Sequence, residues 1–119
     1  MAEGNGECLD RDTILARLDL APVAVQVPEW GGKVYVRPMT GNERDEFEEM
    51  TEPGHSRRHL RARLCAATVC DSAGELLFTL DDLVRIGAKN AAALDRIFPV
   101  AARLSGMTRA DVQELEKKL

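Results

Sequence analysis

The chain has 119 residues, of which 45% are hydrophobic and only 4% are aromatic. This length fits one domain whose single core is built mainly from aliphatic side chains. The 20 acidic residues outnumber the 16 basic ones and give a net charge of −4, so the surface has no general attraction for nucleic acid or for anionic membranes.

Cysteine usage and the N-terminal segment indicate a soluble protein of a reducing compartment. Cys8, Cys65 and Cys70 are odd in number, and the last two lie in an apolar run, where free thiols pack as small hydrophobic groups. The first residues lack the basic and apolar regions of a signal peptide, and no run reaches the roughly 18 apolar residues of a membrane helix. We therefore expect an intracellular protein.

The N-terminal third predicts a flexible lead, a short helix and a β-hairpin. Residues 1–9 read as the lead, and Asp10 or Asp12 caps a helix that carries Ile14, Leu15 and Leu18 and ends before Pro22. Alternating valines over 23–27 and 34–36 predict two half-buried strands, and Pro28 to Gly32 supplies the turn, in which glycines reach positive φ. Such a hairpin needs helices against its valine face.

Three further helices are predicted between residues 40 and 87. Thr40 and Glu43 form a capping-box pattern that opens an acidic helix carrying Phe47, and Pro53-Gly54 ends it. A helix from about residue 60 to 69 is apolar over most of its circumference, so we expect it to be the most buried element. After a polar turn at 71–74, residues 76–78 form a short extended or docking segment, and a brief helix spans 80–86.

The C-terminal part predicts two more helices. Asn90 caps the first, which Gly106 ends, and Pro99 is expected to bend or split it near Asp95. Thr108 and Asp111 open the last helix. The predicted fold is α+β and mostly helical: a short N-terminal helix and a β-hairpin packed on a bundle of about five helices, forming a single domain over residues 10–119.

No residue pattern in the chain indicates catalysis, a cofactor or a metal site. His55 and His59 have the spacing of two ligands on one helix turn, but no Cys-x-x-Cys pair accompanies them, and Cys65 has apolar neighbours. A metal-dependent enzyme using these residues stays an alternative. A second alternative is a small regulator that binds nucleic acid through the cluster from Arg57 to Arg63, although an equally acidic run precedes this cluster.

Trp30, at the tip of the predicted hairpin, has two interpretations. As the only tryptophan of the chain, it either packs as a lid on the domain's own helices or contacts a partner, because tryptophan is enriched at interface hot spots.

The amino-acid sequence of the hairpin region resembles that of a known protein family. Residues 27–48 (VPEWGGKVYVRPMTGNERDEFE) are similar to the signature of tail assembly chaperones from long-tailed, siphovirus-like phages and prophages. Residues 61–64 (RARL), 71–78 (DSAGELLF), 91–98 (AAALDRIF) and 102–107 (ARLSGM) follow in the same order. The resemblance covers roughly residues 12–118.

This resemblance implies a binding protein without enzymatic activity. Such chaperones keep the long tape measure protein soluble and recruit tail tube subunits in the host cytoplasm, and they are absent from the finished virion. The resemblance supplies no binding map, so we predict contacts on physical grounds, from apolar side chains that a groove between small helices would offer. The predicted partner-binding residues are Trp30, Tyr35, Leu94, Ile97, Phe98, Val112 and Leu115. Self-association is a further expectation.

Overall fold

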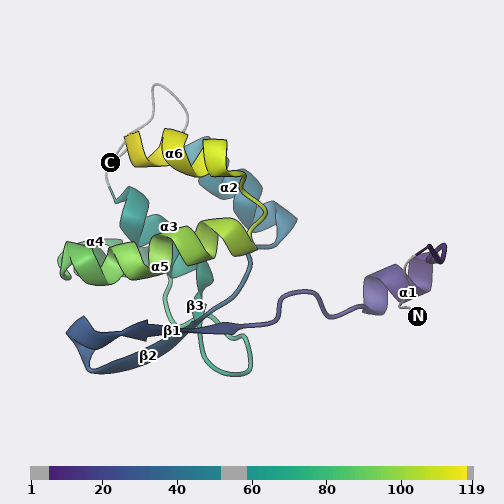
Figure 1. The fold of residues 1–119 in the computed structure, drawn as a ribbon, viewed down its shortest axis with the longest axis horizontal. Helices are drawn as coiled ribbons and strands as arrows, with labels where there is room; N and C mark the ends of the chain where they lie inside the picture. Colours follow the sequence, from purple (N-terminus) through teal and green to yellow (C-terminus); the bar gives the residue numbers. More distant parts are fainter. Residues whose placement is uncertain (1–5, 52–58, 118–119) are drawn as a thin grey trace.

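The computed structural model of the chain describes residues 6–51 and 59–117. Figure 1 shows a small sheet with helices above it and one helix set apart. The elements, in chain order, are α1 (Arg11–Ala16), β1 (Val23–Val27), the 3-10 turn η1 (Pro28–Trp30), β2 (Gly32–Val36), α2 (Gly41–Thr51), α3 (Leu60–Thr68), β3 (Val69–Cys70), the 3-10 turn η2 (Leu80–Asp82), α4 (Leu83–Gly87), α5 (Ala91–Leu104) and α6 (Arg109–Lys117).

The sheet has three antiparallel strands in the order β1-β2-β3. The predicted hairpin is confirmed, with Val25 opposite Val34, while β3 adds a short third strand in which Val69 pairs with Val36. Val25, Val27 and Val36 are buried, and α5 packs against both strands of the hairpin. The period-2 alternation therefore reflects one sheet face covered by helix, and the α+β, mostly helical class is confirmed.

The central helix of the domain is α3, as predicted. Six of its nine residues are buried, and it packs against α2, α4 and α5. Three capping motifs also form as predicted. The side-chain hydroxyls of Thr40, Thr79 and Thr108 each accept a hydrogen bond from a backbone N–H in the first turn of the following helix. Pro53 and Gly54, which we expected to end α2, lie outside the described residues.

Two details of the predicted turns and helices are wrong. Of the two hairpin glycines only Gly31 has a positive φ, 76°, because Pro28–Trp30 form a helical turn and Gly32 already begins β2. Of the predicted bend or split of α5 near Asp95, the split does not occur, since the helix runs unbroken through Pro99. Proline removes a single N–H, the donor to the carbonyl of Asp95, and both residues are exposed, so water can satisfy that carbonyl.

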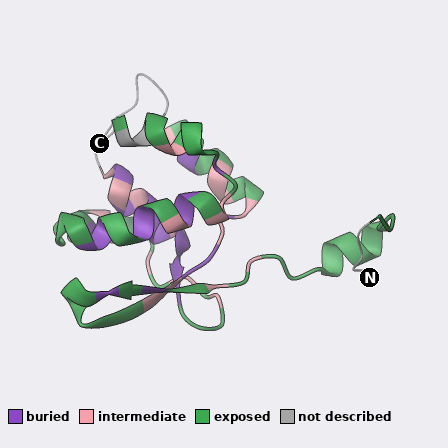
Figure 2. Cartoon of the chain, in the orientation of Figure 1, coloured by how far each residue is buried: buried purple, intermediate pink, exposed green. Residues whose placement is uncertain are grey.

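The N-terminal helix forms but does not pack on the bundle. The Asp10 carboxylate accepts the N–H of Thr13 at 2.9 Å, as a helix cap should. However, every residue from Arg11 to Asp19 is exposed, and α1 lies apart from the other elements (Figures 1 and 2). The predicted packing of this helix is wrong because an extended connector ending at Pro22 carries it away from the body.

Candidate functional site

The segment Leu76 to Leu80 crosses the domain surface and is fixed at both ends. At its start, the N–H of Leu77 donates to the carbonyl of Val69 at 3.1 Å, and Leu76 forms a bridge with Cys70. At its end, Thr79 and Asp82 bond reciprocally and begin η2. The pairing with β3 and the helix cap leave Leu77 and Leu80 each 54% exposed, so both present apolar surface to solvent.

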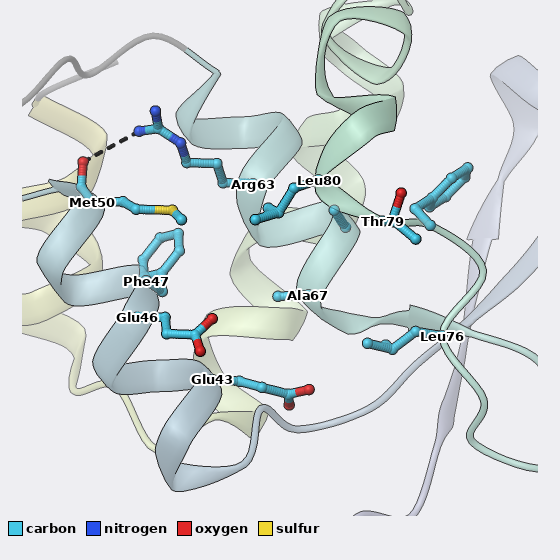
Figure 3. Close-up of a pocket in the computed structure, with 11 residues that line it drawn as sticks. Glu43, Glu46, Phe47, Met50, Arg63, Ala67, Leu76, Thr79 and Leu80 are labelled. Atoms are coloured by element: carbon cyan, nitrogen blue, oxygen red, sulfur yellow. Dashed lines mark hydrogen bonds between the residues drawn. The ribbon is translucent and has the colours of Figure 1, made fainter.

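One hollow lies on the α2–α3 side of this segment (Figure 3). We call it the α2–α3 hollow; its cavity volume is about 180 Å³. Its apolar lining comes from three elements, and charged side chains stand at its edge, where Arg63 Nη1 donates to the carbonyl of Met50 at 3.2 Å. The lining residues are Glu43, Glu46, Phe47, Met50, Arg63, Ala66, Ala67, Leu76, Phe78, Thr79 and Leu80.

A second, wider hollow lies beside Trp30. We call it the Trp30 hollow; Phe78 lines it as well as the α2–α3 hollow, so the two are neighbours. Its apolar lining is Trp30, Cys65, Leu77, Phe78 and Ile86, and its charged lining is Asp82, Arg85 and Lys89. Together the hollows offer apolar surface on both sides of the exposed Leu77 and Leu80.

The hairpin tip that carries Trp30 is held against α5. Glu29 accepts two hydrogen bonds from Arg96, at 2.7 and 2.9 Å, and these bonds lower the pKa of the Glu29 carboxyl. Trp30 is 39% exposed, so it is neither a fully covered lid nor a fully exposed residue.

The α2 edge of the site is held by a paired arginine and glutamate. The Nη1 and Nη2 groups of Arg37 donate to Oε1 and Oε2 of Glu43, at 3.1 and 3.0 Å. The backbone N–H of Thr40 donates to the same carboxylate at 2.8 Å. Burial alone would raise the pKa of Glu43, but the bonds from Arg37 and Thr40 outweigh burial and hold that pKa below its usual value. Because Arg37 follows β2 directly, this pair fixes the start of α2 relative to the sheet.

The structure separates the seven predicted partner-binding residues into different environments. Leu94, Ile97 and Phe98 are buried in the core of α5, so they line no open groove in the isolated chain. Tyr35 is half-buried on β2 with Lys33 Nζ 5.5 Å from its ring centre, and Val112 is half-buried against the core. The side chain of Leu115 lies outside the described part of the chain. Binding through these residues stays a prediction.

Sequence reasoning left Leu77 and Leu80 out of the predicted binding set. A signal was present, because the three consecutive apolar residues 76–78 follow a polar turn and an extended segment can bury only alternate side chains. The run was interpreted as a docking segment, without separating the side chain that packs inward from the one that points outward.

The alternative chemistries find little support among the described residues. Arg61 pairs with Asp95 at 2.7 Å and Arg63 bonds to α2, so this half of the arginine cluster is engaged within the domain; Arg57 and Arg58 lie outside the described residues. Burial raises the pKa of the Cys65 thiol to about 12, which disfavours the thiolate needed for nucleophilic attack or metal binding. His55 lies outside the described residues, and no group of three potential ligands could hold a metal in the part described.

Comparison with solved structures shows which fold the chain has. No protein-family model and no curated protein sequence matches the chain. A solved structure, that of the bacteriophage HK97 tail assembly chaperone, superposes with a TM-score of 0.61 at 20% sequence identity and covers 82% of this chain and 93% of that one. The chain therefore has the fold of a phage tail assembly protein. No helix in the described ranges is long and apolar enough to cross a membrane.

Proposed function

We propose that the chain is a tail assembly chaperone of a long-tailed phage or prophage. In this role it has no enzymatic activity, keeps the tape measure protein soluble and recruits tail tube subunits. It acts in the host cytoplasm and is not part of the finished virion. The fold shared with the HK97 chaperone supports this proposal. The resemblance of residues 27–48 to the hairpin sequence of this family supports it as well.

The observation that carries the proposal is the α2–α3 hollow, whose lining is largely apolar and whose edge carries the exposed Leu80. A long helical protein awaiting assembly exposes apolar stripes that aggregate unless they are covered. Leu80 stands at the edge of the α2–α3 hollow with 54% of its surface exposed, next to a cavity lined by aliphatic and aromatic side chains. An amphipathic helix can place one or two large side chains in such a cavity and cover Leu80 with the rest of its apolar face.

The charged edge of the α2–α3 hollow favours release of a bound client helix as well as its binding. Glu46 is exposed at the rim, and Glu43 is held in place by Arg37. Because the rim stays hydrated, a bound helix buries mostly apolar surface and forms few hydrogen bonds with the chaperone. Such an interface is adaptable and reversible, which suits a protein that leaves its client before the virion is finished.

The test is co-purification of the chain with the tape measure protein of the same phage. Wild-type protein should retain the tape measure protein, and Leu80→Asp should weaken retention by about tenfold or more, since an apolar contact is replaced by a charge. Val84→Asp is the matched control, because Val84 is 70% exposed and lines neither hollow.

The outcomes separate the site from the function. If wild-type protein retains no tape measure protein, the proposed function is wrong. If Leu80→Asp binds as tightly as Val84→Asp, the chaperone role stands but the α2–α3 hollow is not its binding surface. Circular dichroism of both variants must match the wild-type spectrum and melting temperature.

A further inference from the structure

The helix α1 carries exposed apolar residues and buries none of its side chains against the described part of the chain. It has only six residues, and an isolated helix shorter than about 12–15 residues is marginal in water. Its apolar residues are nevertheless exposed: Ile14 and Leu15 on α1 are 55% and 68% exposed, and Leu18, two residues beyond the helix, is 95% exposed. A capped helix start followed by three exposed aliphatic residues is the pattern of a segment that becomes stable when it docks.

The connector directs this helix away from its own domain. Residues 17–22 contain no glycine, Pro22 has a fixed φ, and Ala21, which precedes the proline, is restricted to extended conformations. A sharp reversal is therefore unfavourable. In Figure 1 α1 and the hairpin tip with η1 lie at opposite ends of the hairpin, so the Trp30 hollow is at the far end from the chain's own α1.

The charge of the Trp30 hollow is opposite to that of the N-terminal arm, by which we mean residues 7–19. The side chains of Arg85 and Lys89 line the hollow and make no hydrogen bond or ion pair with another described residue, while Asp82 is engaged in capping η2. The arm carries four acidic residues against two basic ones: Glu7, Asp10, Asp12 and Asp19 against Arg11 and Arg17.

We propose that the N-terminal arm of one copy docks into the Trp30 hollow of a second copy. Ile14, Leu15 and Leu18 would cover the apolar lining around Trp30 and Leu77, and the acidic residues of the arm would face Arg85 and Lys89. Exchange of a terminal segment is a low-cost route to oligomers: reciprocal exchange closes a dimer, and one-way exchange builds a longer assembly. The α2–α3 hollow stays open in both cases.

The test uses the purified full chain alone, so it does not depend on the proposed function. Sedimentation velocity over a wide concentration range gives the mass, and the fluorescence of Trp30, the only tryptophan, reports whether the hollow is covered. We expect the mass to rise with concentration and the emission to shift to the blue in parallel. Leu15→Ser/Leu18→Ser should weaken association by at least about tenfold, because two exposed leucines lose their apolar contact.

Two controls separate docking from general effects. Thr13→Ser/Ala16→Ser changes the opposite side of the same helix and should associate like wild type, since successive residues are about 100° apart around a helix. Arg85→Glu/Lys89→Glu should weaken association through charge, and the wild-type association should weaken with salt. In contrast, Arg103→Glu, an exposed charge reversal on α5, should have little effect.

Three results would overturn the proposal. One is wild-type protein that stays monomeric at every concentration. Another is a Leu15→Ser/Leu18→Ser variant that associates as strongly as wild type. The third is a blue shift of Trp30 that depends on Leu15 and Leu18 but not on concentration, because the arm would then occupy the hollow of its own chain.

Discussion

Replacing Glu43 with glutamine tests the pair that joins the sheet to α2. Arg37 is only 7% exposed and donates to both carboxylate oxygens of Glu43, and the same carboxylate accepts the N–H of Thr40. Glutamine has the same shape but presents one acceptor oxygen and one NH2 group. The variant therefore keeps part of the hydrogen bonding and leaves a buried guanidinium without its counter-charge.

The expected cost of this substitution at neutral pH is about 2 kcal/mol in the free energy of unfolding, in line with hydrogen bonds between charged groups. With a urea dependence of about 1–2 kcal/mol per molar, the unfolding midpoint should fall by about 1–2 M. Circular dichroism in a urea series measures this directly. Glu46→Gln, an exposed position on the same helix, is the matched control and should change the midpoint little.

The pH dependence of the free energy of unfolding shows whether Glu43 stabilises the fold through its charge or through its packing. Folding lowers the pKa of Glu43 below its ordinary value of 4.5, so the pair stabilises the folded state fully above that value, and this stabilisation is lost as pH falls through the lowered pKa. The difference between wild type and Glu43→Gln should be constant above about pH 5.5 and should shrink below about pH 4.5. A difference that stays equal across this range, or no difference at pH 7, would refute the assigned role of the pair.

Three other predictions concern Trp30, Gly106 and the cysteines. Trp30→Ala should lower the free energy of unfolding by about 1–2 kcal/mol, less than for a fully buried tryptophan, because the side chain is 39% exposed; a change above about 3 kcal/mol in urea unfolding would show that it is a lid. Gly106→Ala should cost about 1 kcal/mol, since its φ of 82° ends α5 in the left-handed region, and an unchanged thermal melt would contradict this. A thiol reagent should label Cys8 quickly and Cys65 and Cys70 only on unfolding, because the last two are buried; rapid labelling of three thiols in the native protein would contradict the packing of α3.

Local features of this chain were predictable because their causes are local. Thr40, Thr79 and Thr108 each stand three residues before an acidic residue, and each spacing gives a helix cap in the structure. The alternating valines of the hairpin likewise required only that one sheet face be covered. The short strand Val69–Cys70 escaped prediction because its two residues continue the apolar pattern of α3.

Features that depend on long-range packing could not be obtained from the pattern. The periodicity of α5 marks Leu94, Ile97 and Phe98 as one apolar face, but it does not say whether that face meets the domain's own helices or a partner. The structure shows that they are core residues. For the same reason Ile14 and Leu15 on α1 read as core residues from their spacing, although they are exposed.

The most direct test of the proposed chaperone role is the solubility of the tape measure protein when both proteins are expressed together in bacteria. We predict that wild-type chain moves most of the tape measure protein from the pellet to the soluble fraction and that Leu80→Asp does so markedly less. Val84→Asp should behave like wild type. A tape measure protein that stays insoluble with wild-type chain, or is equally soluble without it, would contradict the account.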